Sequence, residues 1–138
     1  LGQVHQATLK SGETVPPQSI DSAETPIAVW AETRDSVLAE LDEPEILDRE
    51  GKFWFGPMSV DQWIQVVQWD PNTHAWDISK AAGIESHIPD DLASVSHEVI
   101  SGMRETLHKW GLVADQVEIA ENASAAEKFL ALTGRDPR

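Results

Sequence analysis

Residues 53–71 read Phe53-Trp54-Phe55-Gly56-Pro57-Met58-Ser59-Val60-Asp61-Gln62-Trp63-Ile64-Gln65-Val66-Val67-Gln68-Trp69-Asp70-Pro71. These nineteen residues hold three of the six tryptophans and two of the three phenylalanines, and Trp76 follows soon after. A buried Trp or Phe removes roughly 150–250 Å² of surface from water. We therefore expect this stretch to form the centre of the hydrophobic core and its neighbours to cover it.

The second half of this stretch carries the signs of a helix. Ser59 followed by Gln62 is a capping box, in which each residue satisfies the backbone N–H of the other. Val60, Trp63, Ile64 and Val67 then recur at helical spacing, which places them on one face. A strand is the alternative because residues 63–67 are rich in strand-forming side chains. The capping box and the helical spacing of the apolar residues together favour the helix.

Upstream of the stretch the sequence predicts mainly strands. The expected elements are a hairpin at 1–16, a linker at 16–26, a strand at Ile27–Trp30, a helix or further strand at Glu32–Asp42, and a hairpin pairing residues 45–48 with 52–55 through the turn 49–51. The pair Gly56-Pro57 is expected to break the second strand of that hairpin.

Downstream the sequence predicts mainly helices. Asp70-Pro71 is expected to stop the first helix, and Thr73 to cap a short second one, 74–82, with Gly83 past its end. A connection at 84–91 leads to a long helix, 91–110, that Gly111 ends. The remaining expected elements are a short strand at 117–119, a helix at 124–132 and a loose tail at 134–138.

The long helix has two distinct faces. Its apolar positions, all on a 3.6-residue period, are Leu92, Val95, Val99, Ile100, Met103, Leu107 and Trp110. The opposite face carries His97, Ser101, Arg104, Glu105 and His108.

These elements predict an α+β fold with a small antiparallel sheet from the N-terminal half and three or four helices packed on it. We expect residues 1–26 to form a hairpin and linker and 27–138 a single domain. The long helix should cover the aromatic stretch, so that one core contains Trp54, Trp63, Ile64, Val67, Val99, Met103 and Leu107. Trp63→Ala should then cost several kcal/mol, since large aromatic deletions typically cost about 3–5 kcal/mol.

The charge excludes several classes of partner. The chain has 24 acidic and 10 basic side chains, a net charge of −14, and no cysteine. Nucleic acids and anionic membranes both require clustered Lys and Arg, so direct binding to either is not expected. No apolar run approaches the length of a membrane span. The chain begins with Leu1, which suggests a processed or trimmed product, and a cytoplasmic or virion-associated location is expected.

No catalytic or metal-binding signature is present. His97 and His108 lie about 16 Å apart along one helix at 1.5 Å per residue, so they cannot share a metal ion. His74 with Asp77 offers two ligands and His87 a third, but no known metal-ligand spacing occurs. We expect no catalytic residues, no metal and no cofactor. The candidate partner-binding residues are instead Trp69, Trp76, His97, Arg104 and His108, with Trp69 and Trp76 expected to be the exposed tryptophans.

Residues 53–108 resemble the small tail-assembly chaperones and tail accessory proteins of phages. In those families a strand leads through a Pro-x-[Ser/Thr]-Val turn into a helix, and an Ala/Thr-Gly-Ile turn precedes the last helix. The matching residues here are Pro57, Ser59, Val60, Trp63, Gly83, Ile84 and Leu92. The resemblance implies a protein without an active site that works by binding other structural proteins.

Three functions remain open at this point. The first is a non-enzymatic interaction or assembly protein, with a phage tail component and an oligomer among the forms considered. The second is an acidic inhibitor, either an immunity protein or a nucleic-acid mimic, with a basic target. The third is a small enzyme or accessory subunit of an enzyme complex that uses His74, His97 or His108 with a nearby carboxylate.

Overall fold

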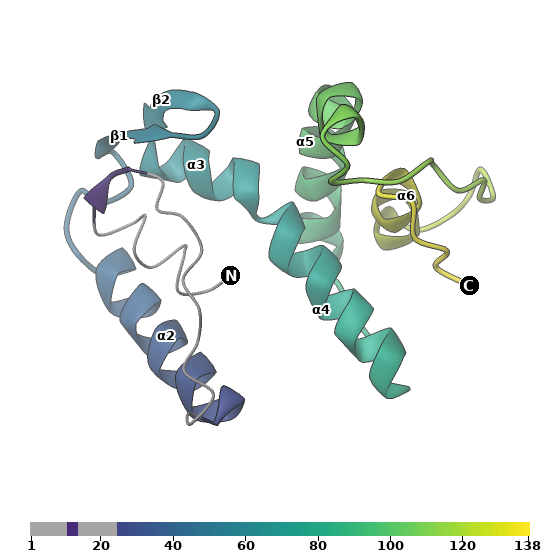
Figure 1. Cartoon of the computed structure of the whole chain (residues 1–138), viewed down its shortest axis with the longest axis horizontal. Helices are drawn as coiled ribbons and strands as arrows, with labels where there is room; N and C mark the ends of the chain where they lie inside the picture. Colours follow the sequence, from purple (N-terminus) through teal and green to yellow (C-terminus); the bar gives the residue numbers. More distant parts are fainter. Residues whose placement is uncertain (1–10, 14–24) are drawn as a thin grey trace. The chain divides into compact units, whose positions relative to one another are not determined.

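The computed structural model describes residues 11–13 and 25–138 (Figure 1). The class is α+β, as predicted, with a two-stranded antiparallel sheet in the N-terminal half. The chain forms two compact units, residues 1–64 and 65–138. The predicted hairpin at 1–16 and linker at 16–26 lie almost entirely outside the described residues, so the predicted division at residue 26 stays a prediction.

The first described helix, α2, spans Pro26–Leu41. The helical alternative for Glu32–Asp42 is thus confirmed, whereas the predicted strand Ile27–Trp30 is wrong because the helix begins six residues earlier. Pro26 stands at the start of the helix, where its fixed φ fits and its missing N–H is not needed. Val29 and Thr33, one turn apart, are the buried residues of α2.

The hairpin lies further along the chain than predicted. It pairs β1, Glu50–Phe53, with β2, Gly56–Ser59, and residues 45–48 form turns instead of a strand. Gly56 has φ 114°, which L-residues with a side chain rarely adopt, so it turns the chain directly into β2. Pro57 does not end the strand, because both strands of a two-stranded sheet are edges, where a missing N–H is tolerated.

The predicted capping box opens α3, which spans Val60–Val67. The Ser59 N–H donates to Gln62 Oε1 at 3.0 Å, and the Gln62 N–H donates to Ser59 Oγ at 3.2 Å. The cap therefore satisfies two donors that the first helical turn leaves open. The helical interpretation of this segment is confirmed.

Trp63 is a core residue of the first unit. It is 5% exposed, and its ring stacks on Phe53 of β1 with centroids 5.2 Å apart and planes 17° from parallel. Val60, one turn before it, is fully buried. Trp54, by contrast, is 70% exposed, so the prediction that it joins the core is wrong. It sits at the tip of the hairpin, between β1 and β2.

The next helix, α4, spans Trp69–Ala82 and begins five residues before the predicted start. Asp70 and Pro71 lie in its first turn, where a proline costs no hydrogen bond, so they do not stop the preceding helix. Thr73 is not the cap either: it is buried, and its hydroxyl donates to the Trp69 carbonyl at 2.7 Å. Gly83 does end α4 in the left-handed conformation, as predicted.

The second unit is built on α5, Asp90–Lys109, which packs against both α4 and α6, Ala125–Leu132 (Figure 1). The bounds of both helices agree with the predictions, and Ser124 forms a full capping box with Glu127. The buried residues of this unit's core are Trp69, Ile88, Ala93, Ile100, Leu107, Val113, Phe129, Leu130 and Leu132.

The face of α5 that is buried differs in part from the predicted one. Ile100 and Leu107 are fully buried, and Val99 and Met103 pack partly buried against the same core, as expected. The buried face of α5 also includes Ala93 and Ser96, both fully buried. Leu92 and Trp110 were expected in the core, but they are exposed.

The segment after α5 is not a strand. Gly111, at φ 74°, ends α5 as predicted, and residues 114–120 run without regular structure. The predicted strand 117–119 is wrong because this segment bonds to the end of a helix. The Val117 N–H donates to the Ala131 carbonyl, and the Ala114 N–H to the Thr133 carbonyl.

Candidate functional site

The two tryptophans predicted to be exposed contribute instead to the core of the second unit. Trp69 is 8% exposed, which contradicts the prediction. Trp76 is partly buried against the same core, and the Lys80 ammonium lies 5.5 Å from its ring centroid. Both residues sit on the side of α4 that faces α5, because seven residues make about two helical turns. Neither offers a fully exposed anchor to a partner.

Arg104 and His108 come together one turn apart on α5, and both bind the segment that follows this helix. Arg104 donates to the Leu132 carbonyl at 3.2 Å and to the Ala114 carbonyl at 2.9 Å. His108 Nε2 lies 3.1 Å from Asp115 Oδ1. These contacts hold the chain between α5 and α6 in place. His97 is partly buried about two turns before Arg104 and three before His108, and the structure does not bring it to either of them.

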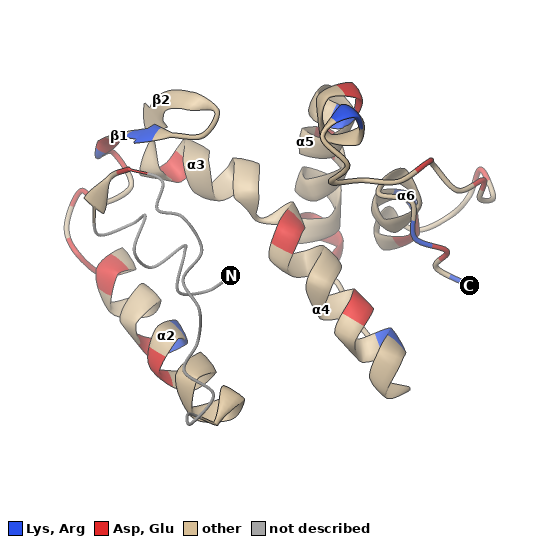
Figure 2. Cartoon of the chain, viewed as in Figure 1, with Lys and Arg blue, Asp and Glu red and all other residues tan. Residues whose placement is uncertain are grey.

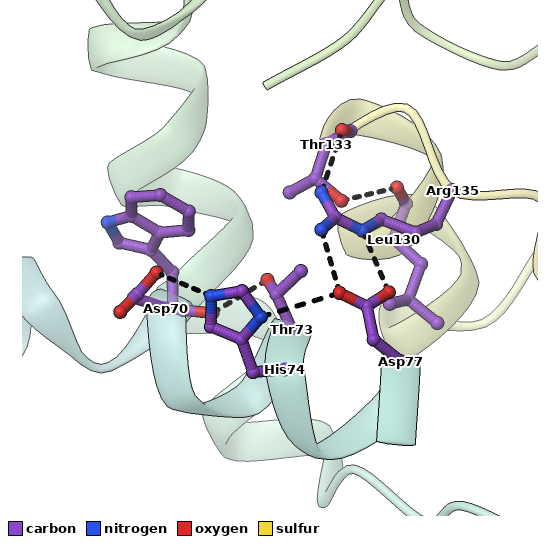
Figure 3. Close-up of polar contacts among 8 residues, drawn as sticks. Asp70, Thr73, His74, Asp77, Leu130, Thr133 and Arg135 are labelled. Carbon is purple, nitrogen blue, oxygen red and sulfur yellow. Dashed lines mark hydrogen bonds and ion pairs between the residues drawn. The ribbon is translucent and has the colours of Figure 1, made fainter. Parts of the chain in front are cut away.

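The most extensive polar cluster joins α4 to the chain after α6 (Figure 3). His74 lies between two carboxylates of its own helix, with Nε2 3.4 Å from Asp70 Oδ1 and Nδ1 3.5 Å from Asp77 Oδ2. Arg135 donates two hydrogen bonds to the carboxylate of Asp77, from Nε to Oδ1 at 3.1 Å and from Nη2 to Oδ2 at 2.8 Å. A further Arg135 nitrogen donates to the Thr133 carbonyl at 3.2 Å. The predicted loose tail is therefore attached at Arg135.

The electrostatics of this cluster fit a structural clamp. The hydrogen bonds from Arg135 hold the pKa of Asp77 below its ordinary value of 3.8, against the opposing effect of burial. Both oxygens of Asp77 accept hydrogen bonds from Arg135, and Oδ2 also lies 3.5 Å from His74 Nδ1, so this one carboxylate connects α4 to the chain after α6 while it contacts a histidine of its own helix. Within residues 11–13 and 25–138, no group of three His, Asp or Glu side chains is placed to hold a metal ion.

The clamp makes a prediction about pH. Folding lowers the pKa of Asp77, so the ion pair stabilises the folded protein at pH values above 3.8, the ordinary pKa of this group. This stabilisation is lost as the pH falls through the lowered pKa of the folded state. Asp77→Asn should lower the free energy of unfolding by about 0.5–1 kcal/mol at pH 7, as expected for a partly exposed pair, and by less in acid. Urea unfolding across pH measures this difference.

Asp136→Asn is the matched control for that series. Asp136 binds Arg138, only two residues away, so this pair joins no separate elements. We expect its removal to leave the unfolding free energy unchanged. A loss as large as that of Asp77→Asn would show that general charge, and not the clamp between α4 and the tail, is responsible.

A second polar feature lies in the first unit, beside the hairpin. The Nε and Nη2 atoms of Arg49 are buried and have no hydrogen-bond partner within the described residues. Arg49 borders a hollow of about 440 Å³ lined by Ser11, Gly12, Glu13, Glu50, Gly51, Lys52 and Pro57. The two cations and two carboxylates of this lining balance one another. The net charge of the lining therefore does not by itself define a ligand.

The most distinctive surface is the outer side of α2. Ile27, Trp30 and Leu38 are 82%, 62% and 54% exposed, and their spacing of three and eight residues puts them on one side of the helix. The Arg34 guanidinium lies between them, 4.8 Å from the Trp30 ring centroid. We call these four residues the α2 outer face. The buried residues of the same helix, Val29 and Thr33, lie outside this row.

Sequence reasoning missed the α2 outer face although its signal was present. Positions 27, 30, 34 and 38 share one face of a helix, but the assignment of Ile27–Trp30 to a strand split the pattern. The same helix also carries a core face, so no single side of it stands out as apolar. Pro26 was the available signal, because proline is common at the first position of a helix and sixteen residues of helix follow from it. It indicated that residues 27–30 and 32–42 belong to one helix.

The chain matches no family model, no curated protein and no solved structure. No helix in the described part of the chain is both long and apolar enough to span a membrane. The arguments about function therefore rest on the residues themselves.

Proposed function

We propose that this protein is a non-enzymatic protein-binding domain that engages its partner through the α2 outer face. The observation that carries the proposal is the exposure of an isoleucine, a tryptophan and a leucine in one row on one helix. Isolated exposed apolar residues are ordinary, but a row of them on one element is typical of an interaction surface. An amphipathic helix laid against a groove is a common mode of protein recognition.

The chemistry of the row supports the same proposal. Trp and Arg are both enriched among the residues that dominate the binding energy at protein interfaces. In this protein the two are stacked on each other in Trp30 and Arg34. The polar clusters described above, in contrast, bind the chain to itself, and so offer less to a substrate or a partner.

The resemblance of residues 53–108 to phage tail-assembly chaperones names the first class of partner to test, a structural protein of a phage tail. The acidic inhibitor is the second candidate, and the net charge of −14 favours it. Under that alternative the partner would be a basic nuclease, toxin or other nucleic-acid-binding protein. The identity of the captured partner separates the two.

Site-specific photo-crosslinking tests the proposal. A benzoylphenylalanine replaces Trp30 in one variant and Trp110, which is 56% exposed in the second unit, in the control. Both are exposed aromatic positions, so each substitution should be tolerated. After irradiation in a lysate of the source, we expect one discrete protein adduct from position 30 and none from position 110. Mass spectrometry identifies the adduct. Equal adducts at both positions, or none at position 30, would count against the proposal.

A further inference from the structure

Arg49 is held in place by backbone hydrogen bonds, yet its side chain has unused donors. Its N–H donates to the Ile46 carbonyl at 3.2 Å, and its carbonyl accepts from the Val60 N–H at 3.0 Å. The side-chain atoms Nε and Nη2, which form one edge of the guanidinium group, are buried without a hydrogen-bond partner among the described residues. A buried donor that lacks a partner costs free energy, because it has given up its hydrogen bonds to water.

The same edge is occupied in the other four arginines of the chain. In three of them Nε and Nη2 together bind the carboxylate of one aspartate, and these pairs are Arg34 with Asp35, Arg135 with Asp77, and Arg138 with Asp136. In Arg104 the two atoms donate to backbone carbonyls. Arg49 alone has no acceptor for this edge in the part of the chain that the structure describes. Two parallel donors match the two oxygens of a carboxylate.

The hollow that Arg49 borders beside the hairpin is bounded by backbone that hydrogen bonds hold in place. Residues 11–13 line it and lie against β1, where the Lys52 N–H donates to the Gly12 carbonyl at 2.8 Å. Gly51 permits this close approach, because a Cβ there would lie 2.7 Å from the Gly12 carbonyl oxygen. The volume of about 440 Å³ falls within the range of small-molecule sites, about 300–1,000 Å³.

Arg49 also borders a second hollow, of about 510 Å³. This one is lined by Glu40, Glu43, Glu45 and Asp48, and Arg49 is the one base among its described lining residues. Four carboxylates repel an anion more strongly than the balanced lining beside the hairpin does. An anionic ligand of Arg49 is therefore expected in the hollow beside the hairpin.

We propose that this hollow binds a small organic carboxylate through the Nε–Nη2 edge of Arg49. The site is separate from the α2 outer face, and the inference does not depend on the proposed function. Lys52, Glu13 and Glu50 also line the hollow, and basic and acidic positions lie close together at β1 (Figure 2). Because the two glutamates repel negative charge, a ligand with a single carboxylate fits this lining better than a more highly charged phosphate.

NMR of the isotope-labelled full chain tests the inference, because each arginine Nε–H gives its own resonance. The probe is sodium acetate, titrated at constant ionic strength with sodium chloride as the balancing salt. We expect acetate to shift the Arg49 Nε–H resonance and the amides of Gly12 and Lys52 along one saturable curve. The Nε–H resonances of the other four arginines should not move, because internal acceptors already occupy them.

Arg49→Met and Arg138→Met are the matched variants, since Met keeps an unbranched side chain without the donors. We expect Arg49→Met to weaken acetate binding about tenfold or more, because it removes two hydrogen bonds to a charged group. Arg138→Met should leave the binding unchanged. Without acetate, Arg49→Met should unfold at a urea concentration no lower than that of the wild type, because it removes a buried charge that has no partner.

Each alternative gives a different result. Acetate shifts that persist in Arg49→Met would overturn the site, because acetate would then bind elsewhere. Tighter binding of sodium phosphate than of acetate would overturn the carboxylate as the ligand. Absence of any shift would overturn the inference, and a lower urea midpoint for Arg49→Met would then show that bound water satisfies the Arg49 edge. Crosslinking at Trp30 decides the proposed function independently of all these outcomes.

Discussion

Trp63→Ala should destabilise the first unit by about 3–5 kcal/mol, the range typical of large aromatic deletions from a core. The side chain is 5% exposed and stacks on Phe53, so its removal takes away apolar burial and leaves that ring without its partner. Because small domains are stable by only about 5–15 kcal/mol, this loss is a large share of the total. Resonances from each unit, followed during urea unfolding, measure the effect.

Trp54→Ala is the matched control for this prediction. It deletes the same side chain from the neighbouring hairpin, but Trp54 is 70% exposed. We expect its unfolding free energy to stay within about 0.5 kcal/mol of the wild type, as is usual for surface substitutions. If Trp63→Ala were equally mild, Trp63 would be a surface anchor, and the core of the first unit would have to lie elsewhere.

The elements that the sequence predicts correctly are those with a local chemical marker at their ends. The capping boxes at Ser59 and Ser124 and the glycines Gly83 and Gly111 mark helix ends through hydrogen bonds and backbone angles that nearby residues determine. Periodicity then fills in α3, α5 and α6 between these ends. This is why α5 and α6 lie within one residue of their expected bounds and α3 begins where expected, although α3 ends at Val67, before the predicted stop at Asp70-Pro71.

The hairpin and the tryptophans depend on information that is not local. Two apolar runs flank residues 49–51, and a second possible turn lies at Trp54 and Phe55. The choice between them rests on which residues pair. Trp54 is left exposed and Trp69 buried because tertiary packing, and not the side chain itself, decides burial. Ala93 and Ser96 were missed for a related reason, since small residues enter a core only where elements pack closely.

The candidate site could be predicted only in part. The residues proposed for partner binding lie in the second unit, where Arg104 and His108 bind the chain itself. The α2 outer face was hidden by a wrong boundary at Glu32. A helix with an apolar outer side resembles a buried strand in sequence, and only the position of its other face, Val29 and Thr33, resolves the ambiguity.

Gly134→Ala should cost about 2–5 kcal/mol, because two penalties coincide at this position. Gly134 ends α6 with φ 88°, where its N–H donates to the Ala131 carbonyl, and an L-residue in this region costs roughly 1–2 kcal/mol. An added Cβ would also lie 2.6 Å from Ala114 Cβ and 3.0 Å from the Asp115 carbonyl oxygen. Relieving that overlap moves packed backbone, at a further cost of about 1–3 kcal/mol.

Gly83→Ala isolates the first, conformational penalty. Gly83 ends α4 in the same way, with φ 67° and an N–H that donates to the Lys80 carbonyl, but an added Cβ there would have no atom within 4 Å. Its substitution should therefore cost only the conformational part, about 1–2 kcal/mol. Chemical unfolding of the two variants gives the difference directly. Equal losses would mean that residues 114–115 do not pack against the end of α6, whereas a larger loss for Gly134→Ala supports that contact, which the Ala114 and Arg104 hydrogen bonds also require.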